Sequence, residues 1–183
     1  MRNIAQGFWL GALMILVAGC GAPSAAGHHH RTAPKNVTVL STGAAPYQGE
    51  KNLKKWVDQA KAAPHNEEAQ ILAGVSAFQN NEPRLAIQYY LKAAADNPND
   101  ATPWNNIGNV YRNELHEDQV AMTYYRKAIK IEPLYDVAWY NLAWTEQSLG
   151  NARAAKATAA EALKVLPATD PDHASFEQIL KNG

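Results

Sequence analysis

From Glu50 to the end of the chain, apolar residues recur at helical spacing, and proline-containing turns interrupt them at regular intervals. The prolines at positions 64, 98, 133 and 167 follow one another after 34, 35 and 34 residues. Proline cannot continue an α-helix, so each of these prolines ends a helical run. A fixed period of this length predicts a repeat array built from helices.

Both ends of this array carry signals for capping helices. After Asp170-Pro171, the side chains of Phe176, Ile179 and Leu180 form one apolar stripe, which predicts a C-terminal capping helix in 170–183. Trp56 precedes Tyr90 by one period, so we interpret 50–66 as the second helix of a degenerate repeat and as the N-terminal cap. Repeat arrays need such caps because an open end leaves core residues exposed.

The first residues have the pattern of an export signal. Arg2 precedes a run of 14 mainly apolar residues, Ile4 to Val17, which is shorter than the roughly 20 needed to span a membrane. Leu16-Val17-Ala18-Gly19-Cys20 then resembles a bacterial lipobox. The resemblance implies a lipoprotein signal peptide in 1–19 and lipid attachment, with fatty acyl chains such as palmitate, at Cys20. An ordinary buried cysteine behind a plain signal peptide and a retained membrane anchor are the alternatives.

That resemblance also implies a cellular location. The protein would be a membrane-anchored lipoprotein on the exported side. Because Gly21 rather than Asp follows Cys20, the expected location in a Gram-negative organism is the outer membrane, facing the periplasm.

Residues 20–49 are rich in Gly, Ala, Ser, Thr and Pro and show no helical period, which predicts a flexible tether. The tether contains His28-His29-His30. Adjacent imidazoles can bind a transition metal weakly, but in a specific site further residues hold the ligands in place by hydrogen bonds, and a tether does not supply them. We therefore expect no metal site there, with adventitious metal binding and a functional carrier site as alternatives.

Composition and charge narrow the function. The chain is 46% apolar and 19% charged, as expected for a globular protein, and its single cysteine excludes an intrachain disulfide. Lys+Arg and Asp+Glu number 17 each, so the basic excess typical of nucleic-acid binding is missing. The sequence contains no phosphate-binding loop, zinc-protease motif or nucleophile elbow, so we expect neither catalysis nor a cofactor.

The repeats resemble the tetratricopeptide repeat, a helix–turn–helix unit of 34 residues. The middle unit fills the signature positions with Trp104, Ile107, Gly108, Tyr111, Ala121, Tyr125, Ala128 and Pro133. The expected fold is therefore all-α, a short α-solenoid of tetratricopeptide repeats at 67–100, 101–135 and 136–169. The middle repeat has one extra residue, which we place in its turn. Glu146 stands where the family usually has an aromatic residue, and we expect the last repeat to open locally there or Glu146 to reach solvent.

In this family, the first helix of each repeat lines a concave groove that holds a ligand. Carried over position by position, the resemblance implies a partner-binding groove that is apolar at one end, rich in amides in the middle and aromatic at the other end. Its predicted residues are Ile71, Val75, Phe78, Asn105, Asn109, Arg112, Tyr140 and Trp144.

These observations lead to a functional hypothesis: a non-enzymatic, lipid-anchored adaptor that binds a peptide or protein partner of the cell envelope in its groove. The membrane would be a second partner, through Cys20, and nucleic acid is not expected. A self-associating scaffold or spacer remains the main alternative, so a homo-oligomer is possible. An enzyme or a metal carrier is a more distant alternative.

Overall fold

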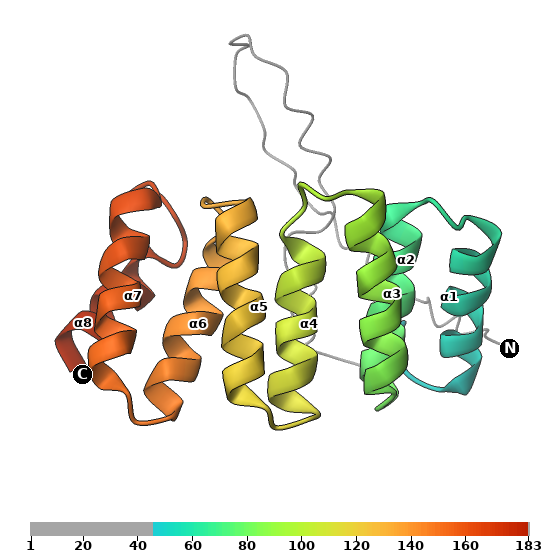
Figure 1. Cartoon of the computed structure of the whole chain (residues 1–183), viewed down its shortest axis with the longest axis horizontal. Coiled ribbons are helices and arrows are strands. Elements are labelled where there is room, and N and C mark those ends of the chain that lie inside the picture. The colour runs from blue at the N-terminus through green and yellow to red at the C-terminus, as the bar shows by residue number, and fades with distance from the viewer. Residues whose placement is uncertain (1–45, 183) are drawn as a thin grey trace, which may run out of the picture. The chain divides into compact units, whose positions relative to one another are not determined.

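The computed structural model describes residues 46–182, which form eight α-helices and no strand (Figure 1). The helices are α1 (Glu50–Ala62), α2 (Glu67–Gln79), α3 (Pro83–Asp96), α4 (Thr102–Asn113), α5 (Asp118–Ile131), α6 (Asp136–Ser148), α7 (Ala152–Val165) and α8 (His173–Asn182). The predicted all-α fold is confirmed. The predicted signal peptide, Cys20 and the histidine run lie outside the described residues.

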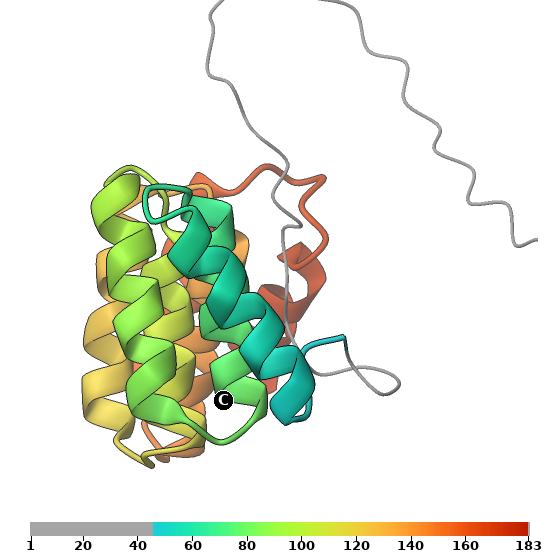
Figure 2. The same ribbon diagram turned by 90° about the vertical axis from the view of Figure 1, so that its right-hand side faces the viewer.

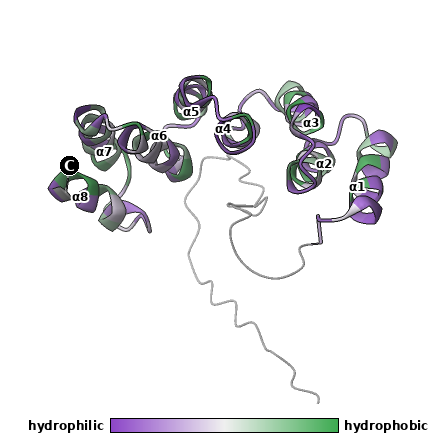
Figure 3. Ribbon diagram, turned by 90° about the horizontal axis from the view of Figure 1, so that it is seen from below, coloured by the Kyte–Doolittle hydropathy of each residue, from purple (hydrophilic) through white to green (hydrophobic). Residues whose placement is uncertain are grey.

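The described helices form three antiparallel hairpins, α2–α3, α4–α5 and α6–α7, which stack in chain order. Figure 3 looks along the helices and shows α2, α4 and α6 in one row and α3, α5 and α7 in the other. Helix α1 packs on α2, and α8 packs on α7 and α6, so each flanks one end of the array. Figure 2 looks at the array from the α1 end and shows α1 nearest the viewer. We call the surface of α2, α4 and α6 the inner face.

Each hairpin turns through one residue with left-handed backbone. These residues are Asn81 between α2 and α3, His116 between α4 and α5, and Gly150 between α6 and α7, with φ of 58°, 56° and 75°. The turns at 80–82 and 149–151 have three residues, whereas the turn at 114–117 has four. The extra residue of the middle repeat therefore lies in its turn, as predicted.

Two hairpins pack a glycine directly against a tyrosine ring. A Cβ atom added to Gly108 on α4 would lie 2.5 Å from Cε1 of Tyr125 on α5, and one added to Gly74 on α2 would lie 2.5 Å from Cε1 of Tyr90 on α3. Tyr90 and Tyr125 are almost completely buried. Glycine thus allows the two helices of a hairpin to approach while a large ring fills the remaining space.

The residues before α1 bind to the C-terminal end of α2. The hydroxyl of Ser76 and the side-chain amide of Asn80 both donate to the carbonyl of Tyr47, at 2.6 and 2.8 Å, and Asn80 Oδ1 accepts from the Gly49 N–H at 2.7 Å. The ring of Tyr47 packs at 5.4 Å from that of Trp56 on α1. These contacts cover one end of α2 and fix α1 against it.

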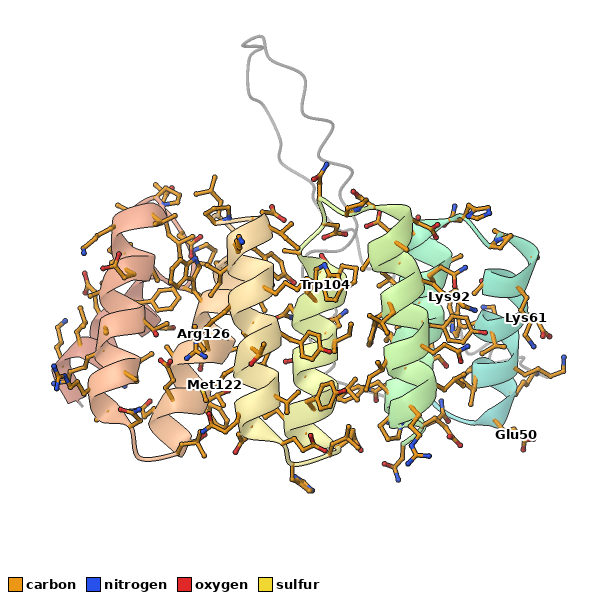
Figure 4. All side chains as sticks on the ribbon, viewed as in Figure 1. Glu50, Lys61, Lys92, Trp104, Met122 and Arg126 are labelled. Atoms are coloured by element: carbon orange, nitrogen blue, oxygen red, sulfur yellow. The ribbon has the colours of Figure 1, made fainter. Side chains whose placement is uncertain are left out.

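The expectation for Glu146 is wrong. Its side chain is buried, 4% exposed, and it is paired. Glu146 Oε1 accepts from Arg126 Nη2 of α5 at 3.0 Å, and Oε2 accepts from the Thr158 hydroxyl of α7 at 2.6 Å. Figure 4 shows Arg126 reaching from α5 toward α6. The repeat stays closed because a neighbouring hairpin supplies the countercharge and its own second helix supplies a donor.

The C-terminal helix closes the other end of the core. Phe176 and Ile179 of α8 are buried in a cluster with Ala143, Ala155, Ala159, Ala162 and Leu166. Across residues 46–182, no helix has both the length and the apolar character needed to cross a bilayer.

Candidate functional site

Three of the residues predicted to face a ligand are buried. Ile71 and Val75 are 6% and 1% exposed, and they belong to the core cluster that joins α2, α3 and α4. Tyr47 and Leu53 pack against the same cluster, so the N-terminal elements occupy space that an open groove would leave to a ligand. Asn105 is 2% exposed. These three assignments to the ligand-facing surface are corrected to structural roles.

The five other predicted residues retain accessible surface. Phe78, Asn109, Arg112 and Tyr140 are half-buried, and Trp144 is 41% exposed. Phe78 lies on α2 beside the first core cluster, whereas the four others come from α4 and α6. The candidate site is therefore concentrated at the α4–α6 part of the inner face.

Side-chain amides connect α4 to α6. Asn141 Nδ2 donates to Asn105 Oδ1 at 2.9 Å and to Asn109 Oδ1 at 3.3 Å. Asn109 Oδ1 also accepts from the Tyr125 hydroxyl at 2.9 Å. Both oxygens are thus occupied, and within residues 46–182 the amide nitrogen of Asn109 makes no hydrogen bond. The network fixes the orientation of Asn109 and leaves its donor group to an incoming acceptor.

A cation lies over the exposed indole at this site. The Arg112 guanidinium stacks on the Trp144 ring, with 3.5 Å between Cζ and the ring centroid. This contact joins α4 to α6 and holds the long side chain of Arg112 in one orientation. Burial raises the pKa of the neighbouring Tyr125 hydroxyl, while Arg112 beside it acts in the opposite direction. The tyrosine therefore remains neutral at physiological pH.

A pocket opens next to Trp144, between α6 and α8. It has a volume of about 200 Å³ and is lined by Tyr140, Trp144, Gln147, Ser175, Gln178 and Ile179. The Tyr140 ring makes an edge contact with Phe176, at 6.5 Å between centroids. The pocket is below the roughly 300–1,000 Å³ of typical small-molecule sites, so its size suits a single side chain.

Two parts of this site were missed from the sequence. Asn141 holds the amide network together, and an amide one repeat after the asparagines of α4 was the available signal. Ser175, Gln178 and Ile179 line the pocket from α8, which was interpreted only as a cap. No periodic signal assigns a capping helix to a binding surface, because it does not belong to a repeat.

The arrangement offers donors, a cation and a small pocket in which Tyr140, Trp144 and Ile179 lie beside polar side chains, and these are means of binding. Among residues 46–182, no group of three or more His, Cys, Asp or Glu side chains is placed to hold a metal ion. The neighbouring Asp172, His173 and Ser175 lie along one turn at the start of α8. Convergent side chains from separate elements, as a catalytic triad needs, are not found among these three.

Comparisons with known proteins agree with this architecture. Residues 101–133 and residues 124–157 each match the tetratricopeptide repeat. The fold is a tetratricopeptide-repeat solenoid. The crystal structure of MamA superposes with a TM-score of 0.57 at 20% identity, over 70% of this chain and 72% of that one. The thermophilic TPR protein TTC0263 of Thermus thermophilus gives a TM-score of 0.60 at 18% identity, over 72% and 73%.

One curated relative is similar in sequence. The peroxisomal targeting signal receptor of Kluyveromyces lactis is 30% identical over 99 residues, which is 54% of this chain. The match spans only 17% of the receptor's length. The tetratricopeptide repeats of the present chain indicate a protein-binding module.

Proposed function

We propose that this chain is a non-enzymatic adaptor that binds an extended peptide segment of a partner protein on its inner face, at α4 and α6. The observation that carries the proposal is Asn109, whose oxygen is fixed by Tyr125 and Asn141 while its amide nitrogen stays without a partner within the described residues. A fixed amide donor matches the carbonyl groups of a peptide backbone.

The surroundings of Asn109 support a peptide rather than a small molecule. Trp144 exposes 41% of its surface next to a pocket with room for one side chain. Aromatic residues of this kind commonly dominate the binding energy of protein interfaces. The relative named above is a targeting signal receptor, which agrees with recognition of a peptide signal.

The test is a pull-down from cell-envelope extract with the full-length chain as bait, beside a Tyr140→Ala/Trp144→Ala variant. A Leu91→Ala/Leu134→Ala variant is the matched control, because it also removes two apolar side chains but from exposed positions on α3 and in the α5–α6 turn. Thermal unfolding of each variant is measured first, and only variants of equal stability are compared.

We expect one protein to be captured by the parent and the control and lost from the inner-face variant. Equal capture by all three chains would move the binding surface elsewhere and contradict the proposal. Capture of the chain itself would favour the self-associating scaffold, which size-exclusion chromatography with light scattering would confirm.

We further propose that Cys20 carries the lipid anchor and that the adaptor works at the cell envelope, in the outer membrane of a Gram-negative organism. The lipobox-like residues before Cys20 support this. Two or more acyl chains are needed for stable anchoring. We expect Cys20→Ser to abolish labelling by radioactive palmitate and to move the protein out of the membrane fraction. Unchanged labelling and fractionation would contradict the anchor without affecting the groove.

A further inference from the structure

We infer that the site is selective for segments in which an acidic side chain lies two residues from an apolar one, with Arg112 binding the carboxylate and the α6–α8 pocket holding the apolar group. This inference rests on the proposed function and names the chemistry of the partner. The site has two halves: Arg112, which lies over the Trp144 ring, and the pocket between α6 and α8.

Charge is the first reason. Helices α2, α4 and α6 contain a single Lys or Arg, which is Arg112, against four acidic residues, Glu67, Glu68, Asp136 and Glu146. Glu146 is already paired with Arg126, and Glu67, Glu68 and Asp136 lie in the first turns of their helices. A ligand carboxylate on the α4–α6 part of the inner face therefore meets one guanidinium.

The geometry of Arg112 is the second reason. Its guanidinium lies over the Trp144 ring, with Cζ 3.5 Å from the ring centroid, so the indole covers one side of the group. A guanidinium fixed in this way presents a planar fork to a carboxylate, which can be bound by two parallel hydrogen bonds. Stacking also lowers the conformational entropy that Arg112 would lose on binding a ligand.

The distance between the two halves sets the spacing in the ligand. The same indole contacts Arg112 and lines the pocket, so the carboxylate and the apolar group are separated by about one ring. In an extended peptide, side chains i and i+2 point to the same side and lie about 7 Å apart. The partner is therefore an acidic–x–apolar or apolar–x–acidic segment, according to the direction of the bound chain.

The experiment is a selection on the full-length chain, purified in mild detergent, from phage-displayed random dodecapeptides. The peptides are joined to the coat protein at their C-terminus, so any carboxylate that is recognised comes from a side chain. Selected peptides are synthesised and their dissociation constants measured, each beside a version in which the acidic residue is replaced by its amide. We expect the acid to be enriched two positions from an apolar residue and the amide to bind about tenfold more weakly.

Variants of the chain test the assignment to Arg112 and to the pocket. Arg112→Gln should bind the acid and the amide peptides equally, and selection on Arg112→Glu should enrich lysine or arginine at the same position. Ser175→Leu fills the pocket and should remove the preference for the apolar residue while the acidic preference remains. Arg84→Gln, which removes an exposed arginine of α3, is the matched control and should behave as the parent.

Two outcomes separate this inference from the proposed function. Tight peptides without an acidic residue, or a tenfold acid preference that persists in Arg112→Gln, would overturn the inference and leave peptide binding intact. If no sequence is enriched on the parent chain, the proposed peptide-binding function and this inference both fail.

Discussion

The α4–α5 and α6–α7 hairpins have different residues at the equivalent positions where their two helices pack together. In α4–α5, Gly108 lies under the ring of Tyr125, and Tyr111 stacks on Tyr124 with 5.3 Å between centroids. In α6–α7, the positions equivalent to the glycine and the tyrosine are Ala143 and Ala159, both completely buried. The positions equivalent to Tyr111 and Tyr124 are Glu146 and Thr158, which are hydrogen-bonded to each other.

The residue types at these facing positions therefore differ between the two hairpins as pairs. A large ring requires a glycine opposite, whereas two alanines divide the same space equally. An aromatic pair can give way to a carboxylate and a hydroxyl only if the carboxylate also finds a cation, which Arg126 supplies from α5. Replacing both members of a pair should therefore cost less than the sum of the two single replacements.

The largest effect is expected from Gly108→Ala. The new Cβ would lie 2.5 Å from Cε1 of the buried Tyr125 ring, and overpacking of this kind destabilises a core by about 3 kcal/mol. Urea unfolding followed by circular dichroism measures the loss. The double variant Gly108→Ala/Tyr125→Ala reproduces the alanine pair of α6–α7, so it should lose less than the sum of the two single losses. Additive losses would contradict the pairing.

A smaller loss is expected from Thr158→Val, which removes the donor to Glu146 Oε2 and keeps the shape of the side chain. Hydrogen bonds to charged groups contribute about 2 kcal/mol, and here the buried acceptor is left without one of its partners. Adding Glu146→Leu should recover part of that loss, because no buried charge then remains. Urea unfolding of the single and double variants measures both losses. A double variant less stable than Thr158→Val would contradict the expected recovery.

The part of the fold that could be predicted from the sequence is the part that repeats along the chain. The spacing of Pro64, Pro98, Pro133 and Pro167 located the repeat period, and the small and aromatic signature residues indicated helical hairpins. Glu146 could not be assigned in this way, because its burial depends on Arg126 and Thr158, and only the folded structure places both beside it. Periodicity describes each repeat by itself and does not show which partners a neighbouring repeat contributes.

The site was predictable to a smaller degree for the same reason. Family positions identified Arg112 and Trp144, and the structure brings these two into contact. The same positions also suggested Ile71 and Val75, which are buried in a cluster against which Tyr47 and Leu53 pack. Residues before the repeats thus cover one end of the inner face, and residues of α8 line the pocket at the other end. Because these residues lie outside the repeats, the repeat pattern does not predict where they pack.

Asn141→Ala tests the connection between the two hairpins. The variant loses donors to Asn105 and Asn109, at 2.9 and 3.3 Å, and leaves the buried Asn105 oxygen without its partner. We expect a loss of about 1 kcal/mol in the free energy of unfolding, since the site is only partly buried and water can replace part of the network. Asn151→Ala, at the N-cap of α7, is a control that removes a hydrogen bond without affecting this network. Peptide affinity should fall in Asn141→Ala only, and equal affinity in both variants would contradict its role in positioning Asn109.

The smallest effect concerns a second carboxylate, which contrasts with Glu146. Glu67 on α2 accepts from Asn97 at 3.0 Å, but it faces Asp96 and Asp100, and its Oε1 atom has no donor within the described residues. Burial, followed by the neighbouring Asp100 and Asp96 carboxylates, raises the pKa of Glu67 to about 7. His65 pairs with Asp96 at 3.3 Å on the same edge.

A raised carboxyl pKa makes the folded state bind a proton that the unfolded state has already lost. Stability should therefore fall as the pH rises from about 4.5 to about 7 and level off above that. We expect the total change to stay below about 1 kcal/mol, because Glu67 is only half-buried and solvent screens part of its interactions. Denaturation of the parent and of Glu67→Gln across this range checks the prediction. The difference in stability between the two should change with pH in that interval alone. A constant difference would show that Glu67 titrates normally and that the acidic edge of α2, unlike the paired carboxylate of α6, has no electrostatic cost.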